Sequence, residues 1–495
     1  MNKQAVASFS AVRRPPKVKL RNQLILGMRL MLPFGLLTAY LAFSSADPFL
    51  TFACMAVLII GAKVTWRVGE PPILFAVFFL QWTQVSLLVI QAAIAGVPIT
   101  YYYFVPGLIT ATWLSLAGLL VLAAGMRLAL GRAVASQPLS QFQAEVWRYS
   151  PRRAFAAYLA AQVVLVGIER VIWMYPGLSQ AFFALSNFKW AFFFALAVIV
   201  IIQRRGYVFL ASAFMFEIVM GFMSYFSDFR QVFFVLVIAA LTARPKVNLR
   251  AVLIALPILG AVLVLLAGWS VVKTEYRGYL NEGSGHQTVL VDPMERLDKI
   301  ADLMWNVGFQ RLGDGFDLMV KRIEYTYYFG RVVDYVPAVV PYTGGVVWGA
   351  AVAHVFEPRL LFPDKPSLEP DIANTERYTG MNLTLQGNIA DTEIPMGYMA
   401  ESYVDFGPIL MFAPIFLLGL MYGGQYRYLA NLRRFRLFAY GAMPVVLEPA
   451  GQFGMTAVKI LGGSLTVFAV TYLVLRFLAP TIQRQIMAKR NLVQA

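Results

Sequence analysis

The sequence predicts an all-α polytopic membrane protein with about 12 transmembrane helices and one large loop on the outer side. The 495-residue chain is 59% hydrophobic and only 14% charged, and its mean hydropathy is +0.64. Its charge is also unevenly divided. Residues 273–407 hold 19 of the 26 acidic residues and a formal charge of −8, whereas the rest of the chain carries +24. This division favours a membrane protein with basic edges over a nucleic-acid binder, which the net charge of +16 alone would suggest.

Twelve apolar runs approach or reach the roughly 20 residues that a helix needs to cross a bilayer. They are Leu24–Phe43, Phe49–Ala62, Ile73–Ala95, Val105–Leu128, Ala154–Trp173, Phe182–Ile202, Tyr207–Tyr225, Val232–Ala243, Val252–Val272, Pro408–Tyr422, Leu437–Gln452 and Ile460–Leu478. The second, eighth, tenth and eleventh runs are the short ones. The runs divide the chain into an N-terminal transmembrane region (1–272, helices 1–9), a large outer loop domain (273–407) and a C-terminal transmembrane region (408–495, helices 10–12).

Lysine and arginine in short loops predict the orientation, because cytoplasmic loops carry an excess of these residues. Six of the first 21 residues are basic. The segment after every even-numbered run is also basic, and the last of these segments holds Arg484, Lys489 and Arg490. We therefore expect both termini in the cytoplasm and residues 273–407 on the opposite side.

Several kinds of site are excluded by composition. Cys54 is the single cysteine and falls inside a predicted span, so we expect neither a disulfide nor a thiol nucleophile. The two histidines, His286 and His354, are too few for a zinc cluster of the usual kind. The chain has no glycine-rich nucleotide-binding pattern. The sequence therefore predicts no metal and no cofactor.

Ionisable residues at the outer ends of the spans are candidate functional groups, since such groups are costly in a membrane. Arg230 precedes a run so short that either this run does not span or Arg230 faces a polar cavity. With Arg170, Lys189 and Arg277 it would suit a polyanionic headgroup such as a lipid pyrophosphate, which arginine binds bidentately. The alternative for Arg170 and Lys189 is that they extend to the interface without binding anything.

The outer loop shows four features. Helical spacing of apolar residues predicts helices over Pro293–Trp305 and Val320–Phe329. A proline-bracketed segment, residues 357–366, carries Arg359 and Lys365 on a constrained loop. Residues 395–407 lead into the tenth run. If this stretch is helical, Glu401 and Asp405 stand one turn apart on one face, with Tyr403 displaced around the axis.

Three short motifs in this order resemble a known family. They are Ser-Asp-Phe-Arg at 227–230, Pro-Arg-x-x-x-Pro-x-Lys-Pro at 358–366 and Glu-x-Tyr-x-x-Phe-Gly at 401–407. Over residues 225–419 the chain is similar to bacterial oligosaccharide repeat-unit polymerases of the Wzy type, which make O-antigen or exopolysaccharide and are relatives of O-antigen ligases. The first five predicted helices carry no part of this resemblance.

The resemblance implies a metal-independent glycosyltransferase at the periplasmic face of the bacterial inner membrane. Such an enzyme moves a growing glycan from undecaprenyl pyrophosphate to the next lipid-linked repeat unit. It implies that Arg230 and Arg359 hold the pyrophosphate and that Glu401, or another carboxylate of the outer loop, activates the acceptor hydroxyl. Further substrate contacts are expected from Lys365, Arg277, Arg170, Tyr403 and Asp405. Membrane lipid, a chain-length regulator and a flippase are the expected partners, with no nucleic acid.

Two other functions remain open. An O-antigen-type ligase would use the same donor with a different acceptor, and the sequence hardly separates it from a polymerase. A polysaccharide or lipid transporter is the alternative from a different class. Transporters often have internally repeated halves, whereas this chain is lopsided, with one outer loop over residues 273–407.

Overall fold

The structure, a computed structural model, describes residues 21–67, 70–131, 139–172, 178–223, 229–243, 249–283, 289–357, 361–362, 364–366, 368–383 and 393–487. Every named element in these ranges is a helix. The predicted all-α class is therefore confirmed.

The described residues of the first half form ten named α-helices and the 3-10 turn η1. They are α1 (Arg21–Ser44), α2 (Pro48–Thr65), α3 (Ile73–Ala95), η1 (Ile99–Tyr101), α4 (Leu108–Leu130), α5 (Leu139–Val146), α6 (Pro151–Ile172), α7 (Ser179–Ser186), α8 (Lys189–Gln203), α9 (Tyr207–Met223) and α10 (Arg230–Ala243).

The second half begins with the longest helix and ends with a short one. Its elements are α11 (Leu249–Leu280), α12 (Pro293–Trp305), α13 (Phe309–Ile323), α14 (Thr326–Tyr335), α15 (Val346–Phe356), α16 (Asp371–Thr379), α17 (Tyr398–Leu410), α18 (Phe412–Ala430), η3 (Arg433–Phe435), α19 (Arg436–Leu447), η4 (Glu448–Gly451), α20 (Ala457–Leu473), η5 (Val474–Leu478) and α21 (Ala479–Ile486).

Six helical segments in the described ranges are long and apolar enough to cross a membrane. They are Pro48–Thr65, Ile73–Ala95, Leu108–Leu130, Gln180–Gln203, Leu259–Leu280 and Ala457–Ile486. The pair α17 and α18, bent by 115°, makes a seventh if it is one span. Other predicted runs correspond to shorter apolar helices, such as α9 and the 14-residue α10. At 1.5 Å per residue α10 is about 21 Å long, less than the thickness of a hydrocarbon core.

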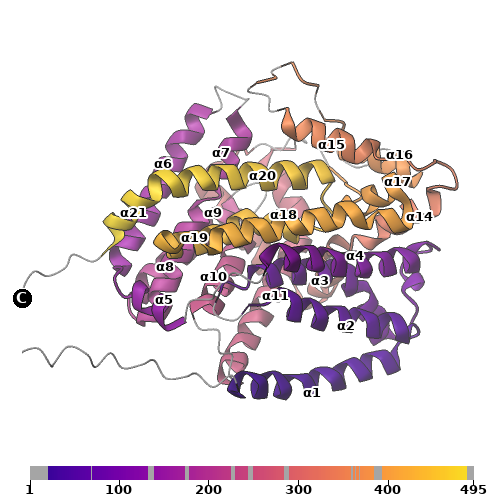
Figure 1. Cartoon of the computed structure of the whole chain (residues 1–495), viewed down its shortest axis with the longest axis horizontal. Helices are drawn as coiled ribbons and strands as arrows, with labels where there is room; N and C mark the ends of the chain where they lie inside the picture. Colours follow the sequence, from indigo (N-terminus) through magenta and orange to yellow (C-terminus); the bar gives the residue numbers. More distant parts are fainter. Residues whose placement is uncertain are drawn as a thin grey trace, which may run out of the picture.

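Helices α4 and α18 pack against each other along a row of glycines. A Cβ atom added to Gly419 would lie 2.3 Å from the carbonyl oxygen of Leu122, and one added to Gly125 would lie 2.4 Å from that of Phe416. A Cβ atom added to Gly423 would lie 2.4 Å from the carbonyl oxygen of Met126. Small residues spaced by four allow two backbones to touch, as they do between membrane helices. Figure 1 shows α18 running beside α4 along the length of the molecule.

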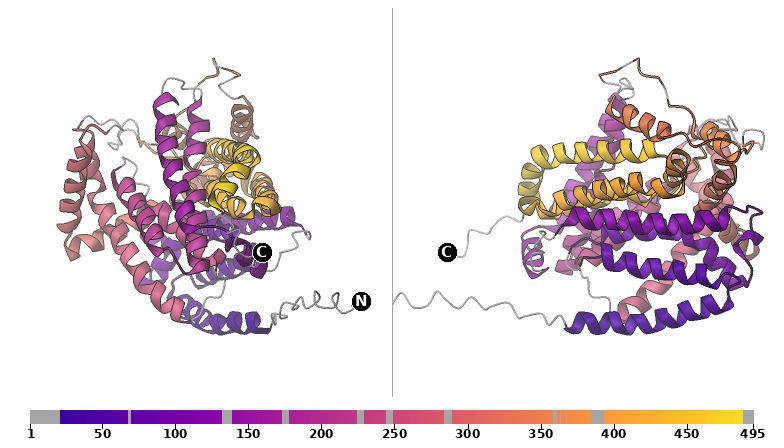
Figure 2. Two further views of the ribbon diagram at one scale, coloured as in Figure 1. Left: turned by 90° about the vertical axis from the view of Figure 1, so that its left-hand side faces the viewer. Right: turned by 45° about the vertical axis from the view of Figure 1, so that its right-hand side comes forward.

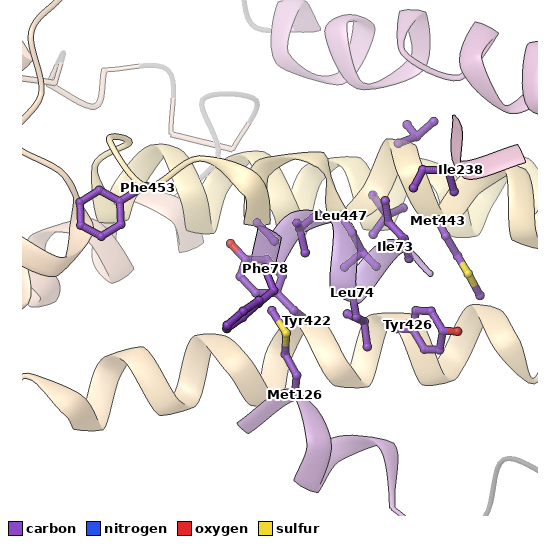
Figure 3. Packing of buried hydrophobic residues seen from close by; sticks show 14 of the residues in the cluster. Ile73, Leu74, Phe78, Met126, Ile238, Tyr422, Tyr426, Met443, Leu447 and Phe453 are labelled. Carbon is purple, nitrogen blue, oxygen red and sulfur yellow. The ribbon is translucent and has the colours of Figure 1, made fainter. Parts of the chain in front are cut away.

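Apolar side chains from distant parts of the sequence fill the space around this helix pair. Figure 3 shows Phe78 of α3, Met126 of α4 and Tyr422 of α18 meeting in one cluster, with Met443 and Leu447 of α19 on another side. All of these side chains are buried. The further views in Figure 2 show α20, then α18 and α19, then α1 to α4 in successive layers.

The acidic segment folds into helices that pack on the rest of the protein. Helix α12 has the predicted bounds, Pro293–Trp305. The predicted helix over Val320–Phe329 is interrupted, because α13 ends at Ile323 and α14 begins at Thr326. Helix α13 lies close along α11, since a Cβ atom on Gly315 would be 2.4 Å from the Ala267 carbonyl oxygen.

Replacing Gly419 with alanine should destabilise the protein by about 1–3 kcal/mol, because the added methyl group forces α4 and α18 apart. Gly424 is the matched control on the same helix, since a Cβ atom there has no neighbour within 4 Å. Thermal unfolding in detergent should show a lower Tm for Gly419→Ala and an equal or higher Tm for Gly424→Ala. Equal Tm values for the two variants would contradict the close contact.

Candidate functional site

The first turns of α17 hold three of the sequence-predicted site residues, and all three are buried. Glu401 is 3% exposed, and its Oε2 atom accepts a hydrogen bond from the backbone N–H of Ala457 at 2.6 Å. Ala457 is the first residue of α20. Because the first N–H groups of a helix have no partner within it, Glu401 serves as the missing acceptor for α20.

Asp405, one turn further along α17, accepts hydrogen bonds from the N–H groups at the start of α15. Its carboxylate accepts hydrogen bonds from the backbone N–H groups of Val347 at 3.0 Å and Trp348 at 2.7 Å, and from the Thr343 hydroxyl. The Trp348 indole N–H also donates to Ser402 on α17, at 3.0 Å. These contacts place Asp405 inside the fold as an anchor for α15.

Tyr403 lies between these two carboxyl groups in sequence and packs among aromatic rings. Its ring centroid is 5.7 Å from that of Phe329 and 5.8 Å from that of Tyr342. The hydroxyl groups of Tyr403 and Tyr342 are 3.5 Å apart. Substrate binding by Tyr403 and Asp405 stays a prediction, and the contacts that the structure gives them are internal.

A lysine that the sequence analysis did not single out stands beside Glu401. The Nζ atom of Lys459, on α20, lies 2.6 Å from Oδ2 of Asp371 and 3.8 Å from Oε2 of Glu393. Glu393 also accepts the N–H of Asp371 at 2.7 Å. The sequence could have identified Lys459 by its position, because it is a cation at the predicted outer end of the last span.

Three arginines from three helices lie around Lys273 of α11. Lys273 of α11 interacts electrostatically with Arg277, Arg322 and Arg230. Arg230 opens α10, and Arg322 lies in the last turn of α13. Partial burial lowers the pKa of Arg322, and repulsion from Arg230 is a second, smaller cause of this lowering. We call Arg230, Lys273, Arg277 and Arg322 the cationic cluster.

This cluster brings together two of the sequence-predicted cations and adds two others. Two like charges about 8 Å apart repel by roughly 2 kcal/mol at an effective dielectric constant of about 20. An anion bound among such charges removes this repulsion. Lys273 and Arg322 were missed because they lie on separate helices, and the packing of α13 on α11 brings the two together.

The other predicted cations have different surroundings. The ammonium of Lys189 lies 2.8 Å from Oε2 of Glu217, whose other carboxyl oxygen accepts hydrogen bonds from Tyr158 and Gln162. Lys365 donates to the carbonyl oxygens of His354 at 2.5 Å and Glu357 at 2.7 Å, so it satisfies the end of α15.

Two of the predicted cations cannot be placed. Arg359 and the side chain of Arg170 lie outside the described residues.

A buried carboxyl group, Glu324, follows Arg322 closely in the chain. Its Oε1 atom accepts hydrogen bonds from the Thr326 hydroxyl and from the Tyr327 N–H, the latter at 2.9 Å, which starts α14. The residue is 2% exposed, and its Oε2 atom has no hydrogen-bond partner within the described ranges. Burial raises the pKa of Glu324 from 4.5 to about 7. Sequence reasoning missed it because Val320–Phe329 was predicted as one continuous helix.

An apolar cavity of about 460 Å³ lies between α9, α11 and α12. Its walls include Phe222 of α9, Leu265 of α11 and Met304 of α12. The cavity therefore shares α11 with the cationic cluster, which takes Lys273 and Arg277 from the same helix.

Residues 126–426 match the protein family described as Domain of unknown function (DUF8712). The chain belongs to this family. The DUF8712 region runs from the end of α4 to α18, so it contains the cationic cluster, Glu324 and α17, and it stops before Lys459. No curated protein and no solved structure matches the chain.

The raised pKa of Glu324 in the DUF8712 region predicts a pH-dependent stability. The folded protein holds the Glu324 proton more tightly than the unfolded chain does, so this contribution is complete below about pH 4.5. It is lost as the pH rises through about 7, and its complete loss lowers the free energy of unfolding by about 3 kcal/mol. We expect the Tm to fall between pH 5 and pH 8, and Glu324→Gln to remove much of that fall.

The control for this experiment is Glu295→Gln, which changes an exposed residue of α12. This variant should keep the pH dependence of the wild type. A pH dependence that survives in Glu324→Gln and equals that of Glu295→Gln would contradict the assignment.

Proposed function

We propose that this protein is a glycosyltransferase of the bacterial inner membrane that joins undecaprenyl-pyrophosphate-linked oligosaccharide repeat units. The proposal includes the twelve-span topology, with both termini in the cytoplasm and residues 273–407 in the periplasm. The observation that carries it is the cationic cluster, in which Arg230 and Arg277 are joined by Lys273 and Arg322. Guanidinium groups match the oxygens of a pyrophosphate in geometry and charge.

The surroundings of the cluster suit an amphiphilic donor of this kind. The apolar cavity between α9, α11 and α12 offers a surface for the prenyl chain. At the start of α14, which follows α13 in the chain, the ring centroids of Tyr103 and Tyr327 lie 4.6 Å apart. Flat aromatic faces of this type pack well against sugar rings.

The reaction transfers a glycosyl group between two oxygen atoms. The acceptor hydroxyl oxygen bonds to the anomeric carbon, and the bond from that carbon to the pyrophosphate oxygen breaks. Undecaprenyl pyrophosphate leaves with the bonding electron pair, and a carboxylate takes the hydroxyl proton. The cluster stabilises the negative charge that develops on the leaving group, while proton transfer contributes a factor of about 100 to 10,000.

The carboxylate that meets the acceptor must be accessible. Glu401, which the resemblance implies, is engaged by Ala457 and nearly fully buried. Glu393 lies 3.8 Å from the Nζ atom of Lys459, and its side chain is half exposed. We therefore assign Glu401 to positioning α20, and Glu393 to accepting the proton.

Reconstituted protein supplied with lipid-linked repeat units should produce a ladder of longer glycans and release undecaprenyl pyrophosphate. Arg322→Gln should lower affinity for the donor about tenfold, which corresponds to the loss of one charge-assisted hydrogen bond. Gel analysis of labelled glycan measures the ladder, and titration with undecaprenyl pyrophosphate measures the affinity.

Arg311→Gln is the matched control, because Arg311 is an exposed arginine at the opposite end of the same helix. It should leave both the ladder and the affinity unchanged. Transfer of a single unit to another acceptor without a ladder would identify a ligase instead. Wild-type affinity for undecaprenyl pyrophosphate in Arg322→Gln would remove the cluster from the mechanism.

Glu393→Gln and Glu401→Gln separate the two carboxyl roles. Glu393→Gln should reduce elongation at least about 100-fold at an unchanged Tm, because the amide cannot take a proton. Glu401→Gln weakens the acceptor for the Ala457 N–H, so it should lower the Tm and leave elongation by the folded protein largely intact. Lost elongation at an unchanged Tm in Glu401→Gln would return the base role to that residue.

A further inference from the structure

A second basic site lies at the other end of α18, away from α17 (Figure 1). A cavity of about 460 Å³, open to the surface, lies between α5 and the residues after it, the η3–α19 turn and α21. Its lining includes Arg148, Arg433, Arg434 and Arg436 together with a single carboxyl group, Glu145. Four positive charges against one negative charge leave this cavity with a formal charge of +3.

The walls of this cavity are fixed by hydrogen bonds between segments far apart in the sequence. The N–H of Ser150 donates to the Ile486 carbonyl oxygen at 3.1 Å, and Gln483 donates to the Tyr149 hydroxyl at 2.9 Å. Arg153 donates to the carbonyl oxygen of Met487. The C-terminal end of α21 is therefore tied to the start of α6, and the cavity does not depend on a single loop.

The arginines differ in how they are held. Arg436 is 5% exposed, and its guanidinium lies 5.8 Å from the centre of the Phe142 ring. Arg148, Arg433 and Arg434 are exposed. One guanidinium thus forms part of the wall, while the other three are at the surface, where the Arg434 guanidinium lies 5.4 Å from the centre of the Phe435 ring.

The chemistry of the site fits a phosphate group at the level of lipid headgroups. Several guanidinium forks around one cavity match phosphate oxygens. Trp147, next to Arg148, is 53% exposed, and its ring lies 5.9 Å from the Arg205 guanidinium. Exposed tryptophan beside arginine is typical of a membrane–water interface.

We infer that this cavity binds the phosphate of an anionic phospholipid from the leaflet on its own side. Basic pockets between membrane helices bind such headgroups. With the predicted orientation, this is the cytoplasmic leaflet. The site is distinct from the cationic cluster and Glu393, to which the glycan chemistry is assigned, and its test does not require activity.

The experiment titrates the purified full-length protein in detergent with short-chain phosphatidylglycerol, using calorimetry. Short-chain phosphatidylcholine and inorganic phosphate are the comparison ligands. The test variant is Arg433→Gln combined with Arg434→Gln, which changes exposed residues and leaves Arg436 in place. The control is Arg204→Gln combined with Arg484→Gln, two exposed arginines outside the cavity.

Wild type and control should bind phosphatidylglycerol saturably, and the test variant should bind it about tenfold more weakly or worse. Phosphatidylcholine should bind much more weakly, because its headgroup carries no net charge. Inorganic phosphate that binds as tightly as phosphatidylglycerol would show a site for a soluble phosphate and overturn the lipid assignment. Equal binding of the two lipids, or an equal loss in both double variants, would overturn the proposal.

Discussion

The unpaired N–H groups at the starts of α15 and α20 impose a constraint on which the centre of the structure depends. A helix leaves its first N–H groups without partners, and no water is available in an apolar interior to satisfy them. Helix α17 meets this need twice within one turn, because Glu401 accepts from Ala457 and Asp405 accepts from Val347 and Trp348. The two carboxyl groups therefore join three helices. They are buried because they bind the N–H groups at the starts of α15 and α20.

Positive charge is concentrated at two sites, which are formed by different helices. The cationic cluster draws on α10, α11 and α13, and the other site on the α5–α6 connection and the η3–α19 turn. Both would favour a phosphate-bearing ligand, since guanidinium and ammonium groups brought together repel one another until an anion binds. The cationic cluster differs from the second site because the apolar cavity on α11 offers space for a lipid chain on the helix that carries Lys273 and Arg277.

Much of the local structure could be predicted from the sequence. Apolar runs gave the long helices α3 and α4 within a few residues, and the periodicity of Leu297, Ile300 and Leu303 gave α12. Apolar periodicity failed at Glu324, where the side-chain carboxylate accepts the Tyr327 N–H three residues ahead and so caps the start of α14. Such a bond competes with helix continuation, and the periodicity of apolar residues does not reveal it.

The sequence by itself determined that the chain is helical and apolar, and that Glu401 and Asp405 share one face of a helix. Both properties follow from spacing along the chain. Only the tertiary structure decided what those carboxyl groups bond and which cations meet. Lys273 and Arg322 are far apart in sequence, and Arg322 approaches Lys273 because Gly315 lets α13 lie against α11. Charges on separate helices become neighbours through packing, which the spacing of residues within one helix cannot specify.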